Sequence, residues 1–212
     1  MAITDYSTLQ SAIIDTAMRS GDTGFAAAVP NFITGAEQLM NYGDGGDLPA
    51  LRTRDMETSA TVTLTSGSGS LPADYLQWRT VYTQDATPIV LKPVPPDFRI
   101  DQYGATSGGY GYFFDIIGST IKTAPASDAN LTLDYYAKIS ALSDSNTTNW
   151  LLTKAPMIYL YGALIHAAPY MMDDDRAQVW GMMYAKGVNG LVASDRSAKY
   201  ARMARVSRYP VP

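Results

Sequence analysis

The chain has 212 residues but no cysteine, and His166 is its only histidine. Without cysteine it can form neither disulfides nor thiolate metal sites. A lone histidine in an apolar stretch offers a general base no partners, so we interpret His166 as a packed structural residue. The G-x-S-x-G nucleophile elbow and the GxxxxGK[ST] phosphate loop are also missing from the sequence. We therefore expect no enzyme, no metal and no cofactor.

Two acidic stretches are the remaining candidates for cation binding. The glycine-rich GDGGD at residues 43–47 occurs once and lacks the EF-hand pattern, so it predicts a loop. The run Asp173, Asp174 and Asp175 falls short of a full oxygen shell. Carboxylates at this place are typical of a helix start, where they meet the positive end of the helix dipole.

Export and membrane signals are also weak. Residues 1–20 lack a basic segment followed by an apolar run, so we expect no secretory signal and a cytoplasmic start. Residues 155–172 contain no Asp, Glu, Lys or Arg, and their length alone would permit a membrane span. Pro156, Pro169 and the acidic flank argue against it. We expect a helix buried between other helices or between subunits.

Charge is distributed unevenly along the chain. The net charge is −4, yet residues 196–212 carry five cations and no acid, which leaves −9 on the rest. Apolar residues make up 46% of the chain, so this acidic body has the material for a core. An acidic body with a basic end indicates that the end binds a partner.

Apolar spacing of three and four residues predicts helices at both ends of the chain. The first is expected to start near Asp5 or Ser7, and the second to follow Pro30 and end before Gly43. After residue 149, helices are expected to begin near Pro156 and at the Asp173 cluster. On the last helix one face is expected to hold Trp180, Met183, Tyr184, Gly187 and Leu191.

Between these helices the pattern changes to short alternating strands with glycine and proline punctuation. Strands are expected at residues 60–64, 75–84, 89–91, 110–117, 120–123 and 131–136. Ser66–Ser70 is read as a break, and Gly118-Ser119 as a tight hairpin turn. The fold class is α+β: a helical bundle with an inserted small antiparallel β domain and an extended C-terminal tail. The segments are 1–48 and 141–195 for the bundle, 49–140 for the β domain and 196–212 for the basic tail.

The tail repeats every three residues, as KYA-RMA-RVS-RYP from Lys199. This period suits a threefold extended helix such as polyproline II, which would place the cations on one line and the apolar residues on another. A disordered basic tail and nonspecific DNA binding are the alternatives. The residues expected to bind a portal or a neighbouring subunit are Arg196, Lys199, Tyr200, Arg202, Met203, Arg205, Val206, Arg208 and Tyr209.

Several elements in order suggest a family. They are Phe32-Ile33 and Ala36-Glu37 on a helix, LPALRTRDME, LPADYL at 71–76, a strand ending in Tyr135-Tyr136, ISALSDSNTTNWLL, YLYGAL, DDD and a Trp-containing last helix. In this order the chain resembles, over most of residues 25–195, the head-to-tail adaptor proteins of short-tailed double-stranded DNA bacteriophages. These are also called connector or head-completion proteins.

The resemblance implies a structural virion protein without enzymatic activity. It implies a twelvefold ring that joins the portal protein to a tail or nozzle protein at the portal vertex, after assembly in the host cytoplasm. Double-stranded DNA would pass through the ring during genome ejection without sequence-specific binding, and an acidic body would avoid trapping it. Helical faces would pack subunits side by side. The residues expected there are Tyr161, Leu164, Trp180, Met183 and Tyr184.

A second hypothesis is a carbohydrate-binding tail component or another small binding module. Trp78, Tyr110 and Tyr112 could form a stacking surface for a glycan. The same aromatic residues suit the packing of strands equally well.

Overall fold

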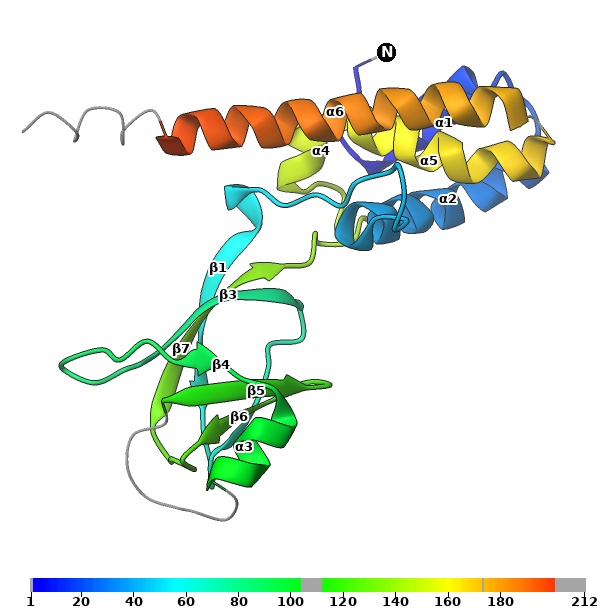
Figure 1. Cartoon of the computed structure of the whole chain (residues 1–212). Coiled ribbons are helices and arrows are strands. Elements are labelled where there is room, and N and C mark those ends of the chain that lie inside the picture. The colour runs from blue at the N-terminus through cyan, green and yellow to red at the C-terminus, as the bar shows by residue number, and fades with distance from the viewer. Residues whose placement is uncertain (1, 104–111, 173, 201–212) are drawn as a thin grey trace, which may run out of the picture. The chain divides into compact units, whose positions relative to one another are not determined.

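The computed structural model describes residues 2–103, 112–172 and 174–200. The chain divides into a helical unit, formed by Met1–Asp55 with Ile139–Pro212, and a β unit, formed by Met56–Lys138 (Figure 1). Helices and strands are thus largely segregated along the chain, and the fold is α+β as predicted. The β unit lies within the segment 49–140 that the sequence marks as an insertion.

Side-chain caps fix the starts of the first two helices. For α1 (Tyr6–Thr16), Asp5 Oδ1 accepts the Thr8 N–H at 2.8 Å and Thr8 Oγ1 accepts the Asp5 N–H at 2.9 Å, so the predicted start is confirmed. For α2 (Thr23–Tyr42), Asp22 accepts the Phe25 N–H at 2.9 Å. The predicted start of this helix after Pro30 is wrong, because the Asp22 cap begins it earlier and Pro30 lies inside it.

In the described part of the chain after the β unit there are three helices: α4 (Trp150–Lys154), α5 (Pro156–Met171) and α6 (Asp174–Tyr200). Pro156 occupies the first turn of α5, as predicted. Because α6 continues to Tyr200, the extended conformation predicted from residue 196 is wrong for residues 196–200. Alanine, lysine and arginine favour helix, and this preference outweighs the three-residue repeat there. Residues 201–212 of the predicted tail lie outside the described part.

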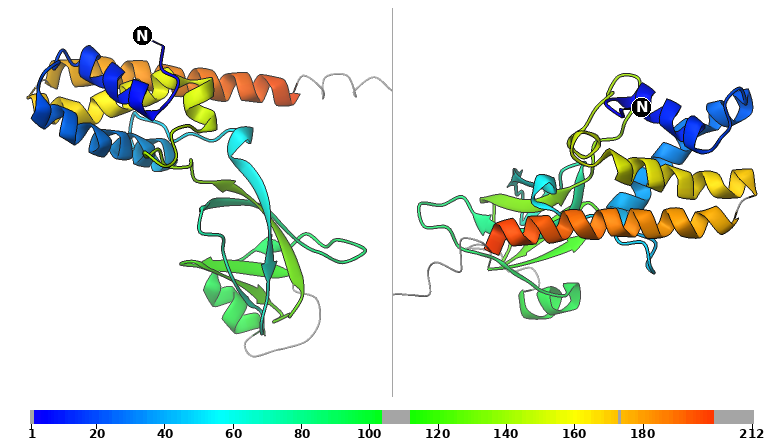
Figure 2. Two further views of the ribbon diagram at one scale, coloured as in Figure 1. Left: turned by 180° about the vertical axis from the view of Figure 1, so that it is seen from behind. Right: turned by 90° about the horizontal axis from the view of Figure 1, so that it is seen from above.

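Helix α5 packs against both α2 and α6 (Figures 1 and 2). Glycines allow this close packing: a Cβ at Gly162 would lie 3.1 Å from the Ala36 Cβ, and one at Gly187 would lie 3.1 Å from Ile158 Cγ1. The apolar surface of α5 is therefore covered by neighbouring helices, as its composition predicts. Among the described residues, none of the helices combines the length and apolar character needed to cross a membrane.

The β unit contains two sheets. The first has the order β1 (Glu57–Thr63), β7 (Asn130–Ala137), β3 (Tyr75–Thr83) and is antiparallel. The second has the order β2 (Ser68–Ser70), β6 (Thr120–Ala124), β5 (Phe113–Ile117), β4 (Lys92–Pro93). A short helix, α3 (Pro96–Tyr103), precedes β5. Both sheets contribute side chains to one core: Val62, Leu64, Leu71, Val81, Leu91, Phe114, Ile121, Leu131, Leu133 and Tyr135.

The strand predictions for this unit need three corrections. The strand expected at residues 89–91 is reduced to an isolated bridge between Val90 and Tyr82, and strand β4 lies just after it. Ser66–Ser70, read as a break, is instead a turn leading into the short strand β2. The expectation of a purely antiparallel domain is wrong at β4, which pairs in parallel with β5 over two residues. The hairpin at Gly118-Ser119 is confirmed, since Ile117 pairs with Thr120 and Gly118 has a φ of +60°.

The packing of α6 leads to the first prediction. Trp180 is 7% exposed, whereas Met183, three residues further along the same helix, is 45% exposed, so the expectation that Met183 shares the packed face of Trp180 and Tyr184 is wrong. We expect Trp180→Ala to lower the free energy of unfolding by about 3 to 5 kcal/mol, because it empties a large buried site. Met183→Ala is the matched control and should change it by less than about 0.5 kcal/mol. Urea unfolding followed by circular dichroism tests this, and equal stability of the two variants would contradict the assignment of the buried face.

Candidate functional site

Two polar residues of α2 hold the segment through which the chain returns from the β unit. Glu37 Oε1 accepts the N–H of Leu142 at 2.7 Å, and Asn41 Oδ1 accepts the N–H of Ile139 at 3.1 Å. The two side chains are four residues apart on one face of the helix and both are buried. Together they fix residues 139–142 on the helical unit.

Asn149 extends this network to the next helices. Its Oδ1 accepts the Leu152 N–H at 2.9 Å and so caps α4, and its Nδ2 donates to Tyr159 Oη at 2.6 Å. The hydroxyl of Tyr159 in turn donates to Glu37 Oε1 at 3.3 Å. A hydrogen-bonded chain thus links α2, α4 and α5 around the returning segment.

Burial shifts the titration of both acidic groups in the network. Desolvation raises the pKa of Glu37, although hydrogen bonds from Leu142 and Tyr159 oppose the shift. Desolvation also raises the pKa of Tyr159, and the nearby Glu37 charge adds to it. A carboxylate surrounded by fixed donors inside the helical unit acts as a structural acceptor. No pattern in the sequence marks Glu37 for this role, because its partners lie more than 100 residues further along the chain.

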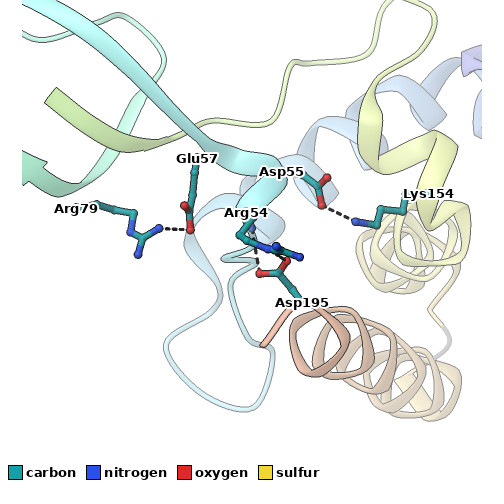
Figure 3. Close-up of polar contacts among 6 residues, drawn as sticks. All are labelled: Arg54, Asp55, Glu57, Arg79, Lys154 and Asp195. Atoms are coloured by element: carbon teal, nitrogen blue, oxygen red, sulfur yellow. Dashed lines mark hydrogen bonds and ion pairs between the residues drawn. The ribbon is translucent and has the colours of Figure 1, made fainter. Parts of the chain in front are cut away.

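Ion pairs join separate segments within the helical unit and within the β unit (Figure 3). In the helical unit, Arg54 Nε lies 2.6 Å from Asp195 Oδ1, and Lys154 Nζ lies 2.6 Å from Asp55 Oδ2. Burial alone raises the pKa of Asp195, but hydrogen bonds from Arg54 and the charge of Arg54 and Lys154 outweigh it and lower the pKa. The first pair therefore anchors the C-terminal part of α6.

Two further ion pairs lie within the β unit. Arg79 pairs with Glu57 (Figure 3). Its guanidinium also stands 5.4 Å from the centre of the Tyr136 ring. Asp115 is almost fully buried on β5 and has Arg99 of α3 2.9 Å from its carboxylate. This pair gives the buried acid a compensating charge. The first ion pair joins strand β3 to strand β1, and the second joins helix α3 to strand β5.

A groove lies on the surface of the helical unit, between the loop that follows α2 and helices α5 and α6. Its apolar part includes Leu48, Ile165 and Met182, and its acidic part includes Asp44 and Asp47. We call this the acidic groove. Asp44 also shapes the loop, because its Oδ1 accepts the N–H groups of Gly46 at 2.8 Å and Leu48 at 3.1 Å. The GDGGD stretch is thus a loop, as predicted.

A second hollow adjoins the acidic groove and shares Asp44 with it. Tyr42 and His166 are among its lining residues. The ring of His166 packs on Gly35, where a Cβ would lie 2.9 Å from ring atoms. Desolvation lowers the pKa of His166, opposed by a hydrogen bond with the Gly35 backbone. His166 is thus packed on one side, against Gly35 of α2, and exposed on the other, so the interpretation as a packed residue is correct only for the side that faces α2.

The structure places the five residues expected in subunit packing at different depths. Leu164, Trp180 and Tyr184 are buried within the helical unit itself. Tyr161 is half-buried and Met183 is exposed, so these two have side-chain surface available to a second subunit.

Only the first part of the predicted binding tail falls in the described residues. Arg196 is exposed on α6, and the backbone of Lys199 and Tyr200 continues that helix. Six of the predicted residues lie outside the described part: Arg202, Met203, Arg205, Val206, Arg208 and Tyr209. Among the described residues there is no group of three or more His, Asp or Glu side chains placed to hold a metal ion.

Two of the aromatic residues considered for glycan stacking are described. Trp78 packs edge-on against Phe114 with ring centres 5.3 Å apart, and Tyr112 is exposed. Tyr110 lies outside the described residues. Trp78 therefore helps to cover the core of the β unit.

The described residues thus combine a packed helical unit, a β insertion, exposed apolar side chains and an acid-lined groove on the helical unit. In a comparison with protein families, the SU10 adaptor protein family matches residues 4–208. The chain belongs to this family, which confirms the predicted class of phage adaptor protein and supports a structural, non-enzymatic role in the virion. Membership implies a place at the head–tail junction and association with portal and tail proteins. A search of the curated proteins finds no match.

The buried network gives a pH-dependent prediction. The folded pKa of Glu37 is raised, so its contribution to stability is fully present below the unfolded pKa of about 4.3 and is lost as pH rises through the folded pKa. Glu37→Gln keeps an oxygen for the Leu142 N–H but does not titrate. We expect the stability of the natural chain relative to Glu37→Gln to fall as pH rises from about 4 to 7.

Urea unfolding of both proteins across this pH range measures the effect. Glu37→Ala serves as a control for the hydrogen bond, because it leaves the buried Leu142 N–H without its acceptor and should cost about 1 to 3 kcal/mol. Parallel stability curves for the natural chain and Glu37→Gln would show that the carboxylate titrates normally.

Proposed function

We propose that this protein forms a closed ring that joins the phage portal to a tail or nozzle protein and continues the DNA channel. The family match over residues 4–208 carries this proposal. We further propose a ring of twelve copies, the number implied by the resemblance to adaptors of short-tailed double-stranded DNA phages. In such a ring the subunits are held together by noncovalent contacts between their surfaces.

The charge distribution supports a channel role. The chain without residues 196–212 carries −9, so a ring of such bodies repels the phosphate backbone and lets DNA pass during genome ejection without holding it. The cations gathered at the C-terminal end are then available for a protein partner, either the portal or a neighbouring subunit. Assembly takes place in the host cytoplasm, and the finished ring lies at the portal vertex of the virion.

Sedimentation and imaging with the cognate portal protein test the proposal. We expect the free protein to be largely monomeric and to form a closed ring on the portal, because docking of the basic end on a partner would couple binding to assembly. A stable ring of the free protein at low micromolar concentration would contradict this coupling. Failure to bind the portal at all would contradict the proposed function.

The basic end itself is tested by truncation after Tyr200, which keeps the whole of α6 and the pair between Arg54 and Asp195. We expect a folded protein that no longer joins the portal. Undiminished portal binding by the truncated chain would remove residues 201–212 from the mechanism.

Charge reversal separates the two kinds of contact. The double variant Arg202→Glu with Arg205→Glu should bind the portal more weakly than the natural chain. Portal binding by the natural chain should itself weaken as the salt concentration rises. Met203→Ala with Tyr209→Ala should weaken docking with little salt dependence. The exposed pair Arg19→Glu with Lys92→Glu changes the net charge equally and is the matched control. Portal pull-down across salt concentrations measures all three.

A further inference from the structure

The acidic groove combines two features that suit a particular kind of ligand. Its apolar side is accessible, since Met182 is 65% exposed and the neighbouring Tyr42 is 61% exposed. Asp44 and Asp47 at its edge are also exposed. An extended peptide with alternating cations and apolar side chains would satisfy both features, because its charges would meet the carboxylates while its apolar residues cover Leu48 and Met182.

The chain itself contains such a segment. Residues 201–212, ARMARVSRYPVP, carry three arginines and no acid, with Met203, Val206 and Tyr209 between and beside them. Its charge is opposite to that of the groove, and its apolar residues recur at a fixed spacing. Residues 201–212 therefore complement the acidic groove in charge and in the placement of apolar side chains.

Length prevents this segment from filling the groove of its own chain. The groove loop lies beside Gly181, because a Cβ there would be 3.4 Å from Leu48 Cδ2. Nineteen helical residues separate Gly181 from the end of α6 at Tyr200, which is about 28 Å along the helix.

The chain must first reverse direction to return along α6. A reversal takes a turn of about four residues, so only residues after about 204 could run back. Eight fully extended residues span at most about 28 Å, so only the last residue would arrive at the loop. Arg202, Arg205 and Arg208 would all fall short of Asp44 and Asp47. A second copy can supply the same segment without this limit.

We propose that residues 201–212 of one copy dock in the acidic groove of a second copy. The inference deepens the proposed function and rests on it: in a closed ring each copy gives one segment and receives one. Such a contact joins two different surfaces, and a rotation that closes turns it into a ring. The groove and the basic end are then two halves of one interface between subunits.

Cross-linking tests this directly, because the natural chain has no cysteine and introduced thiols are the only ones present. One full-length copy carries Met182→Cys in the groove, and a second copy, distinguished by mass, carries Val206→Cys. The control replaces the first by Met18→Cys, another methionine that is exposed, in the turn after α1. We expect oxidation to give several-fold more mixed covalent dimer with Met182→Cys than with Met18→Cys.

Charge dependence is tested in the same system. Asp44→Asn with Asp47→Asn removes both charges but keeps a side-chain oxygen for the loop hydrogen bonds of Asp44. Adding this pair to the groove copy should reduce the mixed dimer to the control yield, as should raised salt. Equal yields from Met182→Cys and Met18→Cys would overturn the proposal, and so would a mixed dimer unaffected by loss of the carboxylates.

The experiment is run on the free protein at raised concentration and on the protein bound to its portal. Rings on the portal without the groove cross-link would overturn this inference and leave the proposed function standing. A carboxylate-dependent cross-link between copies that do not bind the portal would support the inference and contradict the proposed function. The two failures are therefore distinguishable.

Discussion

The helical unit depends on one buried carboxylate that receives the chain from far along the sequence. Glu37 lies on α2, and the N–H that it accepts belongs to Leu142, beyond the whole β unit. Burying an acid is unfavourable unless donors surround it, and here Leu142 and Tyr159 supply them. These two hydrogen bonds hold the returning segment and α5 on α2. Helices α4 and α5 then begin from a fixed point.

Features specified by neighbouring residues could be predicted from the sequence. The start of α1 follows from Asp5 and Thr8, and the hairpin at Gly118 follows from a residue that tolerates positive φ. The separation of helical ends from a central β segment follows from the change in apolar period. Pro30 does not mark the start of α2, because a proline inside a helix looks the same in sequence as one at its first turn, and the capping residue is Asp22.

Features that depend on distant residues could not be predicted in the same way. Strand β4 is two residues long and exists because β5 lies beside it, so its own sequence carries almost no signal. Glu37 is unremarkable in sequence because its main partner is a backbone N–H, which every residue but proline possesses. The acidic groove joins the loop after α2 to α6, residues more than 130 positions apart. The basic C-terminal segment, by contrast, was found from composition alone.

The pairing of β1 with β7 affects how this protein can change over evolution. Glu57, one residue into the β unit, pairs with Tyr136, two residues before its end, so the insertion leaves and rejoins the helical unit at neighbouring strands about 5 Å apart. Strands beyond this pair can be lengthened, shortened or replaced by another domain without moving the two junctions. The β unit could in this way be exchanged for another domain whose first and last strands pair as β1 and β7 do.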